Sequence, residues 1–356
     1  MRKRMISILF AGIICAGTGS LVFAAESETP ETAKTGDLQD TERGSSDEQH
    51  DGAHKMGEKP DGERAPGGRG GNVGGNGGGM AENEEEVQSV IDENASKFGQ
   101  YSYTDEASGI TIEYSLFIPK DYVEGTEYPM IMYIPDSSGA GKSAEEIVEQ
   151  YYGADVWVTD EDQAKHPSFV MVPALSGSVV DDNWNVSEQV EVVVNLIGEL
   201  QEQYSIDADR LYTTGQSMGC MISLYLNSRY PDLFAASMFV GGQWDISVLD
   251  VLEEQTFFYI VSGGDDKASG GQNEVKQMFD VDDVPYSYSG WSAQEDPDSQ
   301  NAMVEELLKE GNKANMICFD TGSVFKDGQS GSEHMYSFNY AYKLTAVRDW
   351  LFEQSR

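Results

Sequence analysis

Cysteine is scarce in this chain of 356 residues, which has only Cys15, Cys220 and Cys318. Because the three are widely spaced, they form no CxxC zinc site and no disulfide framework of the kind that staples a small fold. Cys220 and Cys318 fall next to or within strands that the usual sheet order keeps several strand spacings apart, beyond disulfide reach. We therefore expect two free, buried thiols.

Basic residues are also few, with 23 Lys and Arg against 62 Asp and Glu, and the formal net charge is −39. Nucleic acids and anionic membranes favour clustered positive charge, so we expect neither as a partner. Asp280, Asp282 and Asp283 could suggest calcium, but they lack the spacing of an EF-hand loop, and we interpret them as a solvated loop. We predict no metal site.

Residues 1–24 have the pattern of a secretory signal. Three basic residues (Arg2–Arg4) precede the uncharged, apolar stretch Met5–Phe23, and compact residues lead up to Ala24. Cleavage is predicted after Ala24. The alternative is an uncleaved membrane anchor, because the run approaches the ~20 residues that a spanning helix needs. No second apolar span follows, so we expect a secreted, extracellular protein whose mature form has no membrane span.

Residues 25–86 form an acidic and glycine-rich segment, with ten glycines in 62–79 alone. So few large apolar side chains cannot bury enough surface to offset the loss of chain entropy, which predicts a disordered linker. Two interpretations stay open. The arm is either a spacer that keeps the following domain near a cell wall or a plain solubilising linker.

Residues 87–356 alternate between strand-like and helix-like patterns. The expected strands are Ile110–Ile118, Met130–Ile134, Ser168–Val172, Arg210–Thr214, Phe234–Val240, Phe257–Val261 and Asn315–Phe319. Between them, apolar residues recur at helical spacing, most clearly in 187–203 and near the C-terminus. This alternation predicts an α/β domain with a mostly parallel central sheet and helices on both faces. In such sheets the ligand binds beyond the carboxyl ends of the strands.

The motif Gly215–Gly219 (GQSMG) lies between the expected strand Arg210–Thr214 and the helix-like Cys220–Arg229. This strand–turn–helix context is typical of a nucleophile elbow. The turn is so sharp that the residues flanking the serine must be tiny, and it lifts the hydroxyl above the sheet edge. Ser217 is thus the candidate nucleophile, and the backbone N–H of Met218 is a candidate oxyanion donor. A structural Gly-Ser turn is the alternative.

A serine nucleophile needs a base, and the chain has only four histidines. His50 and His54 lie in the predicted arm. His166 precedes a strand, which places it at the amino edge of the sheet, away from the expected site. His334 lies in a Gly/Ser-rich loop after the last expected strand and is therefore the candidate base.

The third member of a triad should orient the histidine and stabilise its cation. The apolar strand Phe257–Val261 is followed at once by a turn that contains Asp265 and Asp266. Either carboxylate would complete the order Ser…Asp…His, and we favour Asp265 over Asp266. The Gly-, Asp- and Ser-rich segment 265–300 is a candidate lid.

A second oxyanion donor usually comes from the loop after an earlier strand. Here that loop follows Met130–Ile134, and the backbone of Ser137 or a neighbour is the candidate. Gln216, Trp184 and Trp244 lie at or near the productive edge and are candidates for the substrate pocket, with ordinary packing as the alternative for the two tryptophans.

At these residues the chain resembles the α/β-hydrolase superfamily. It is most similar to secreted bacterial serine hydrolases of the prolyl-oligopeptidase-like and polyhydroxybutyrate-depolymerase-like esterase groups. The matching stretches are Tyr114–Tyr122, Tyr128–Gly139, Tyr204–Trp244 and His334–Gln354. The resemblance implies an α/β-hydrolase fold, with Ser217 as nucleophile, Asp265 as acid and His334 as base. Many relatives have His-Gly where this chain has Pro135-Asp136, so the second oxyanion donor stays open.

The function that we expect is a secreted serine hydrolase that cleaves carboxylic esters, of small molecules or polymers, through an acyl-enzyme and without a cofactor. A serine peptidase is the first alternative; we favour esters because no propeller or gating domain that would select peptides is apparent in the sequence. The second alternative is an inactive binding protein on the same scaffold, suggested by Pro135-Asp136 and the long arm.

Overall fold

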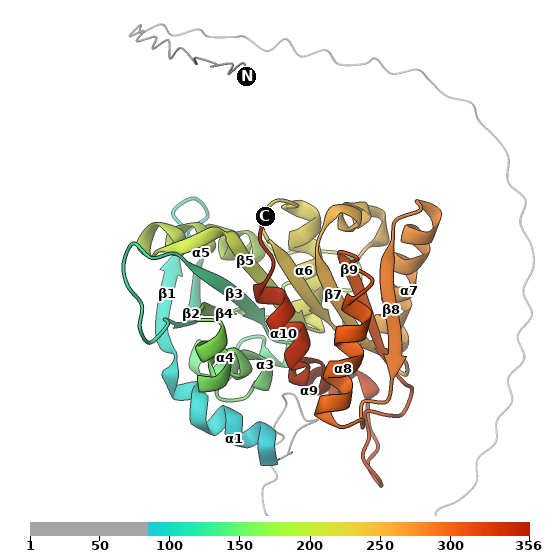
Figure 1. Cartoon of the computed structure of the whole chain (residues 1–356). Coiled ribbons are helices and arrows are strands. Elements are labelled where there is room, and N and C mark those ends of the chain that lie inside the picture. Colours follow the sequence, from blue (N-terminus) through green and yellow to red (C-terminus); the bar gives the residue numbers. More distant parts are fainter. Residues whose placement is uncertain (1–84) are drawn as a thin grey trace, which may run out of the picture. The chain divides into compact units, whose positions relative to one another are not determined.

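The structure is a computed structural model and describes residues 85–356 (Figure 1). The predicted signal 1–24, the cleavage point after Ala24 and nearly all of the predicted arm lie outside the described residues. The described part begins with α1 (Glu85–Asn94), so the helix starts slightly before the expected boundary at Val87. Val87 and Ile91 are buried one helical turn apart, and this apolar stripe seats the helix on the domain.

One sheet organises the described residues, with the strand order β1-β2-β4-β3-β5-β6-β7-β9-β8. The strands are β1 (Gly99–Thr104), β2 (Thr111–Phe117), β3 (Tyr128–Ile134), β4 (Phe169–Ala174), β5 (Ile206–Gln216), β6 (Ala236–Val240), β7 (Phe257–Ser262), β8 (Tyr286–Trp291) and β9 (Ala314–Phe319). β2 runs antiparallel to both of its neighbours, β1 and β4, whereas β3 to β9 are mutually parallel. The expectation of a mostly parallel sheet is confirmed.

Helices cover both faces of this sheet, as expected. The further helices are α2 (Ala144–Val148), α3 (Tyr152–Asp155), α4 (Asp160–Lys165), α5 (Gln189–Gln203), α6 (Met218–Arg229), α7 (Asp266–Val281), α8 (Pro297–Leu308), α9 (Glu333–Lys343) and α10 (Thr345–Phe352). Side chains of α1, α3, α8, α9 and α10 share one core, and those of α5, α6 and α7 share the other. Figure 1 shows α8, α9 and α10 together in front of the sheet.

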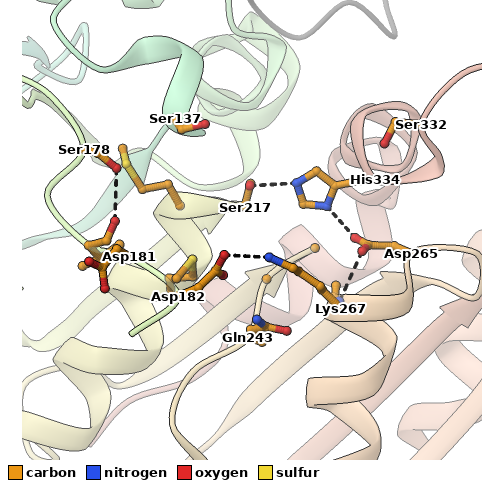
Figure 2. Close-up of a pocket in the computed structure, with 16 residues that line it drawn as sticks. Ser137, Ser178, Asp181, Asp182, Ser217, Gln243, Asp265, Lys267, Ser332 and His334 are labelled. Carbon is orange, nitrogen blue, oxygen red and sulfur yellow. Dashed lines mark hydrogen bonds and ion pairs between the residues drawn. The ribbon is translucent and has the colours of Figure 1, made fainter. Parts of the chain in front are cut away.

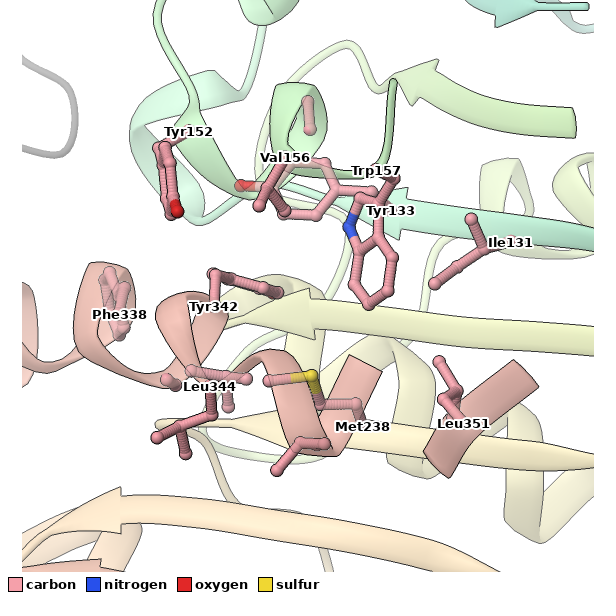
Figure 3. Close-up of a cluster of buried hydrophobic side chains, with 14 of the residues drawn as sticks. Ile131, Tyr133, Tyr152, Val156, Trp157, Met238, Phe338, Tyr342, Leu344 and Leu351 are labelled. Atoms are coloured by element: carbon pink, nitrogen blue, oxygen red, sulfur yellow. The ribbon is translucent and has the colours of Figure 1, made fainter. Parts of the chain in front are cut away.

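Strand β3 shows how the sequence builds both cores. Its Ile131 and Tyr133 point to the α9–α10 face, whereas Met130, Met132 and Ile134 point to the α5–α6 face. Successive side chains of a strand alternate between faces, so a strand that is buried on both sides must be apolar throughout. On the first face, aromatic rings from the sheet and from α9 meet around Trp157 (Figure 3).

Two strands, β1 and β8, were not expected from the sequence, and they form the two edges of the sheet. The candidate lid 265–300 contains α7, β8 and the start of α8. From β7 the chain passes through α7 to the edge strand β8 and then returns through α8 to β9, beside β7. Right-handed crossovers in opposite directions put α7 and α8 on opposite faces.

Cys220 and Cys318 are free thiols, as expected, and Cys220 is buried whereas Cys318 is only partly so. Burial raises the pKa of the Cys220 thiol, which keeps it protonated beneath the elbow. Within residues 85–356, no helix combines the length and the apolar character that crossing a membrane requires.

Candidate active site

The backbone at Ser217 adopts the strained turn that the GQSMG motif predicts. Ser217 has φ 51° and ψ −112°, between the last residue of β5 and the first of α6. Such a conformation costs a non-glycine residue about 1–3 kcal/mol and persists only where its surroundings enforce it. Glycine is required on both sides: a Cβ on Gly219 would lie 2.0 Å from the carbonyl oxygen of Ile134, and one on Gly215 would lie 2.5 Å from the backbone of Gly219.

A continuous chain of hydrogen bonds joins Ser217, His334 and Asp265 (Figure 2). Asp265 Oδ2 lies 2.5 Å from His334 Nδ1, and His334 Nε2 lies 2.8 Å from Ser217 Oγ. An ionised carboxylate can only accept, so the proton belongs on Nδ1, and Nε2 is left to accept from the serine hydroxyl. This is the tautomer that a general base for serine requires.

Three parallel strands bring these residues together from distant parts of the sequence. Ser217 follows β5, Asp265 follows β7, and His334 comes after β9 in the first turn of α9 rather than in a loop. All three therefore reach the carboxyl edge of the sheet, where ligands of such sheets bind.

The structure distinguishes the two candidate acids. Asp265 is 7% exposed and is the N-cap of α7, with Oδ1 accepting from Ala268 N and Oδ2 facing His334. Asp266 begins the helix and its side chain is exposed. His166, as expected, lies away from this site: Nε2 is 2.9 Å from Asp349, and the ring stacks on Phe352.

The two candidate oxyanion donors, Met218 and Ser137, line the same pocket as Ser217 and His334. Met218 N is at the start of α6, where backbone N–H groups lack helical partners and the helix dipole favours negative charge. Ser137 lies in a short turn that Asp136 caps, with Oδ1 accepting from Ser138 N at 2.8 Å. The departure Pro135-Asp136 thus provides an anchor for this loop.

The side chain of Gln216 does not line the pocket, which corrects the sequence expectation. As the last residue of β5 it is 3% exposed, and its side chain lies in a buried network instead. Gln216 Nε2 donates to Asp136 Oδ2 at 2.8 Å, and its Oε1 accepts from Tyr133 OH at 3.0 Å. The sequence offered only one signal for this network, the unusual Asp136.

The pocket over Ser217 has a volume of about 540 Å³. Its walls combine small or apolar side chains with hydroxyl, amide and charged groups: Ser137, Ser178, Val180, Asp181, Asp182, Met221, Gln243, Lys267, Ala268 and Ser332. Lys267 Nζ lies 2.6 Å from Asp182 Oδ2 (Figure 2), which links the start of α7 to the 178–187 loop. Both side chains are more than half exposed, so this ion pair contributes little stability.

The two tryptophans lie outside the residues that line this pocket. Trp244 is 4% exposed and packs edge-on against Tyr225 and Trp184, so for Trp244 the packing interpretation holds. Trp184 is 37% exposed and has φ 64°, an unusual conformation for a bulky residue. It lies two residues from Asp182 on the loop that forms one wall.

The site brings together groups suited to proton transfer and nucleophilic attack. Ser217 provides the oxygen, His334 an imidazole in the basic tautomer, and the turns at Ser137 and Met218 backbone N–H groups. Among the described residues, no group of three or more His, Cys, Asp and Glu side chains is arranged to hold a metal ion.

Comparisons with known proteins place this architecture among enzymes of one fold. No family model and no curated protein matches the chain. The solved structure of a thermostable esterase matches with a TM-score of 0.56 and 24% identity, over 75% of this chain and 64% of that one. A feruloyl esterase module from Clostridium thermocellum (TM-score 0.49, 13% identity, 71% of this chain and 87% of that one) is a weaker likeness. An acylaminoacyl peptidase from Pyrococcus horikoshii is also a weaker likeness, with a TM-score of 0.44 and 13% identity over 72% of this chain and 41% of that one.

The chain spans less than two thirds of the esterase that it matches, and at this identity the likeness concerns the fold alone. That fold agrees with the strand order, the antiparallel β2 and the strand–elbow–helix at Ser217. Residues 85–356 therefore have the α/β-hydrolase fold.

Proposed function

We propose that the protein is a secreted serine hydrolase that cleaves carboxylic esters, with Ser217, His334 and Asp265 as its triad. The observation that carries this proposal is the hydrogen-bonded chain from the strained Ser217 through His334 to the buried Asp265. Strain of this kind is maintained where a function uses it, and here it presents the serine hydroxyl to a pocket.

In the first half of the reaction, Ser217 Oγ attacks the carbonyl carbon of the ester while its proton passes to His334 Nε2. The carbonyl oxygen becomes an oxyanion that the N–H of Met218, and in our proposal that of Ser137, stabilise. His334 then gives the proton to the departing alcohol as the C–O bond breaks, which leaves an acyl-enzyme on Ser217. Asp265 holds the imidazole in the required tautomer and stabilises its cation.

In the second half, a water molecule takes the place of the alcohol. His334 Nε2 accepts a proton from the water as its oxygen attacks the acyl carbon, and the proton returns to Ser217 Oγ as the acid leaves. Every bond formed and broken is thus covered by the residues of the site and one water, without a cofactor.

Two observations support an ester rather than a peptide substrate. The pocket of about 540 Å³ is of the size that takes small molecules. Residues 85–356 also belong to one compact unit, without a separate folded domain within that range to select peptides. Asp181 and Asp182 on the wall disfavour polyanionic substrates. The signal pattern of residues 1–24 supports export, so the expected substrates are extracellular small or polymeric esters.

The test is hydrolysis of p-nitrophenyl acetate, butyrate and octanoate by the full chain, beside Ser217→Ala, His334→Ala and the matched control His166→Ala. We expect turnover by the wild type and by His166→Ala, and loss of nearly all turnover in the other two variants. A wild type that cleaves p-nitroanilide peptides as fast as the esters would favour the peptidase alternative. A wild type inert toward both would favour the binding protein.

A further inference from the structure

A second carboxylate, that of Glu333, lies beside the triad without belonging to it. Its Oε2 accepts from Ser262 Oγ at 2.7 Å and from Gly264 N at 3.0 Å, and its Oε1 accepts from Gly322 N at 2.9 Å. Ser262 ends β7, and Gly322 lies in the turn after β9. One side chain of α9 therefore ties together the turns that follow two neighbouring strands.

The contact with the β7 turn is possible only because residue 264 is glycine. A Cβ at Gly264 would lie 2.0 Å from Glu333 Oε1 and 2.3 Å from Oε2. Any side chain there would push the carboxylate away from the turn. Gly264, directly in front of Asp265, thus has a structural reason, which is the close approach of Glu333.

These contacts lie next to two residues of the triad in the sequence. Gly264 directly precedes Asp265, and Glu333 directly precedes His334. The backbone that carries the acid and the backbone that carries the base are therefore joined one residue before each side chain. Ser332, the N-cap of α9, forms no side-chain capping bond, so Glu333 provides the polar anchor for the start of this helix.

We propose that Glu333 is a positioning residue, which holds the first turn of α9 so that His334 lies within hydrogen-bond distance of both Asp265 and Ser217. This inference rests on the proposed function of the triad. Glu333 acts through His334 and Asp265, because its contacts are with Ser262, Gly264 and Gly322 and none is with Ser217.

The chemistry of the three donors explains why a carboxylate is needed. One hydroxyl and two backbone N–H groups all donate, and an ionised carboxylate only accepts. A glutamine has one carbonyl oxygen and an NH₂ group, so Glu333→Gln would bring its own N–H groups toward at least one backbone N–H. The variant keeps the size of the side chain but breaks part of the link.

The experiment compares Glu333→Gln with the wild type in the full chain. We expect kcat for p-nitrophenyl butyrate to fall by about 10–100-fold, because a small misplacement of a catalytic group costs up to this much. KM should stay within about twofold, because Glu333 does not line the pocket. Ser262→Ala, which removes one of the three donors, should show the same pattern with a smaller loss of kcat.

A spectroscopic readout separates positioning from a general loss of stability. The His334 Nδ1 proton in its short bond to Asp265 should give a far-downfield ¹H NMR signal, which we expect to weaken or shift upfield in folded Glu333→Gln. Asp207→Asn is the matched control. It removes a carboxylate that also accepts two hydrogen bonds, from Arg210 and the backbone of Asp209, but at the amino end of β5. It should change neither kcat nor the signal.

Glu333→Gln with unchanged kcat and an unchanged downfield signal would overturn the inference. So would a loss of activity that only follows the folded fraction, as measured by circular dichroism at the assay temperature. A wild type that hydrolyses no ester would defeat the proposed function instead. In that case the NMR comparison of wild type, Glu333→Gln and Asp207→Asn would still decide whether Glu333 positions His334.

Discussion

Two buried acidic residues on the connection between β3 and β4 differ in whether they have hydrogen-bond partners. Asp136 is 2% exposed, and its oxygens accept from Ser138 N and Gln216 Nε2, with Tyr151 OH also within reach at 3.3 Å. Asp155 is 0% exposed, and neither of its oxygens has a hydrogen-bond partner. Asp136 directly precedes Ser137, which lines the pocket, whereas Asp155 is the last residue of α3.

Asp136 and Asp155 differ in the hydrogen-bond donors that the fold provides for a buried carboxyl group. A buried carboxylate is tolerated as an anion only where hydrogen bonds replace its hydration; otherwise it takes up a proton. Burial raises the pKa of Asp155 well above its usual range, which makes it a neutral acid. At the pocket, Asp136 is surrounded by dipoles that also fix the Ser137 loop, and Asp265 has its own partner in His334. We infer that the donors around Asp136 order the site, whereas Asp155 has no donor and no part in the site.

The largest effect is expected from neutralising the carboxylate that contacts the base. Asp265→Asn should lower kcat by about 10³–10⁴-fold, because an amide next to Nδ1 favours the wrong tautomer of His334. Steady-state hydrolysis of p-nitrophenyl butyrate measures this. A loss below about tenfold would show that Asp265 does not set the tautomer.

A smaller loss is expected at Asp136. In Asp136→Asn the side chain can no longer accept from both Ser138 N and Gln216 Nε2. The Ser137 loop should loosen, and kcat should fall by about 10–100-fold, somewhat less than removal of an oxyanion donor costs. Thermal unfolding of the same variant shows whether the fold survives. An unchanged kcat would separate this network from the oxyanion loop.

At Asp155 the comparison predicts a gain instead of a loss. Asp155→Asn replaces a carboxyl that must be kept protonated with a neutral group of the same shape. We expect it to stabilise the fold by about 1–3 kcal/mol at pH 8, because the cost of keeping a proton on the buried carboxyl at that pH disappears, and to leave kcat unchanged. Urea unfolding measures the first and ester hydrolysis the second. Destabilisation would mean that the carboxyl group has an unseen partner.

Asp155 should also change how the free energy of unfolding depends on pH. Folded Asp155 keeps its proton after the unfolded chain has lost it, because its pKa is raised in the fold. The stability that this gives is fully present below the usual Asp pKa of about 4 and is lost as pH rises toward the raised value. Urea unfolding from pH 4 to 8 should therefore show a steeper decline for the wild type than for Asp155→Asn. Equal slopes would contradict the burial of a protonated Asp155.

The smallest effect is expected at Asp266, which is next to Asp265, where the largest effect is expected. Asp266→Asn removes an exposed carboxylate at the first position of α7. Both kcat and KM should stay within about twofold of the wild type. If Asp266→Asn instead lost as much activity as Asp265→Asn, the acid of the triad would be reassigned.

The interior of the fold was predictable and its edges were not. Seven expected strands overlap β2 to β7 and β9, since strands buried on both faces are continuous apolar runs. The missed strands, β1 and β8, have the sequences GQYSYT and YSYSGW. No residue of β1 is buried, and β8 mixes buried residues with exposed ones. An edge strand pairs with another strand on one side only and is less buried, so its sequence contains fewer apolar residues.

The site divides in a similar way. The strand ends located Ser217 and narrowed the acid to Asp265 or Asp266, because each follows its strand closely in sequence. His334 was found by elimination among the four histidines of the chain. Asp136 and Glu333 could not be found in this way. Each has a partner that is distant in sequence, Gln216 for Asp136 and Gly264 for Glu333. Such contacts depend on how the strands are ordered, which a single sequence does not specify.

If Ser217 is an activated nucleophile, a probe that reacts only with activated serines should label it covalently. The full chain is treated with a fluorophosphonate probe, and the modified peptide is identified by mass spectrometry, beside Ser217→Ala and His334→Ala. We expect one adduct, on Ser217, which is absent from Ser217→Ala and strongly reduced in His334→Ala. No adduct on the folded wild type, or an equal adduct in Ser217→Ala, would contradict it.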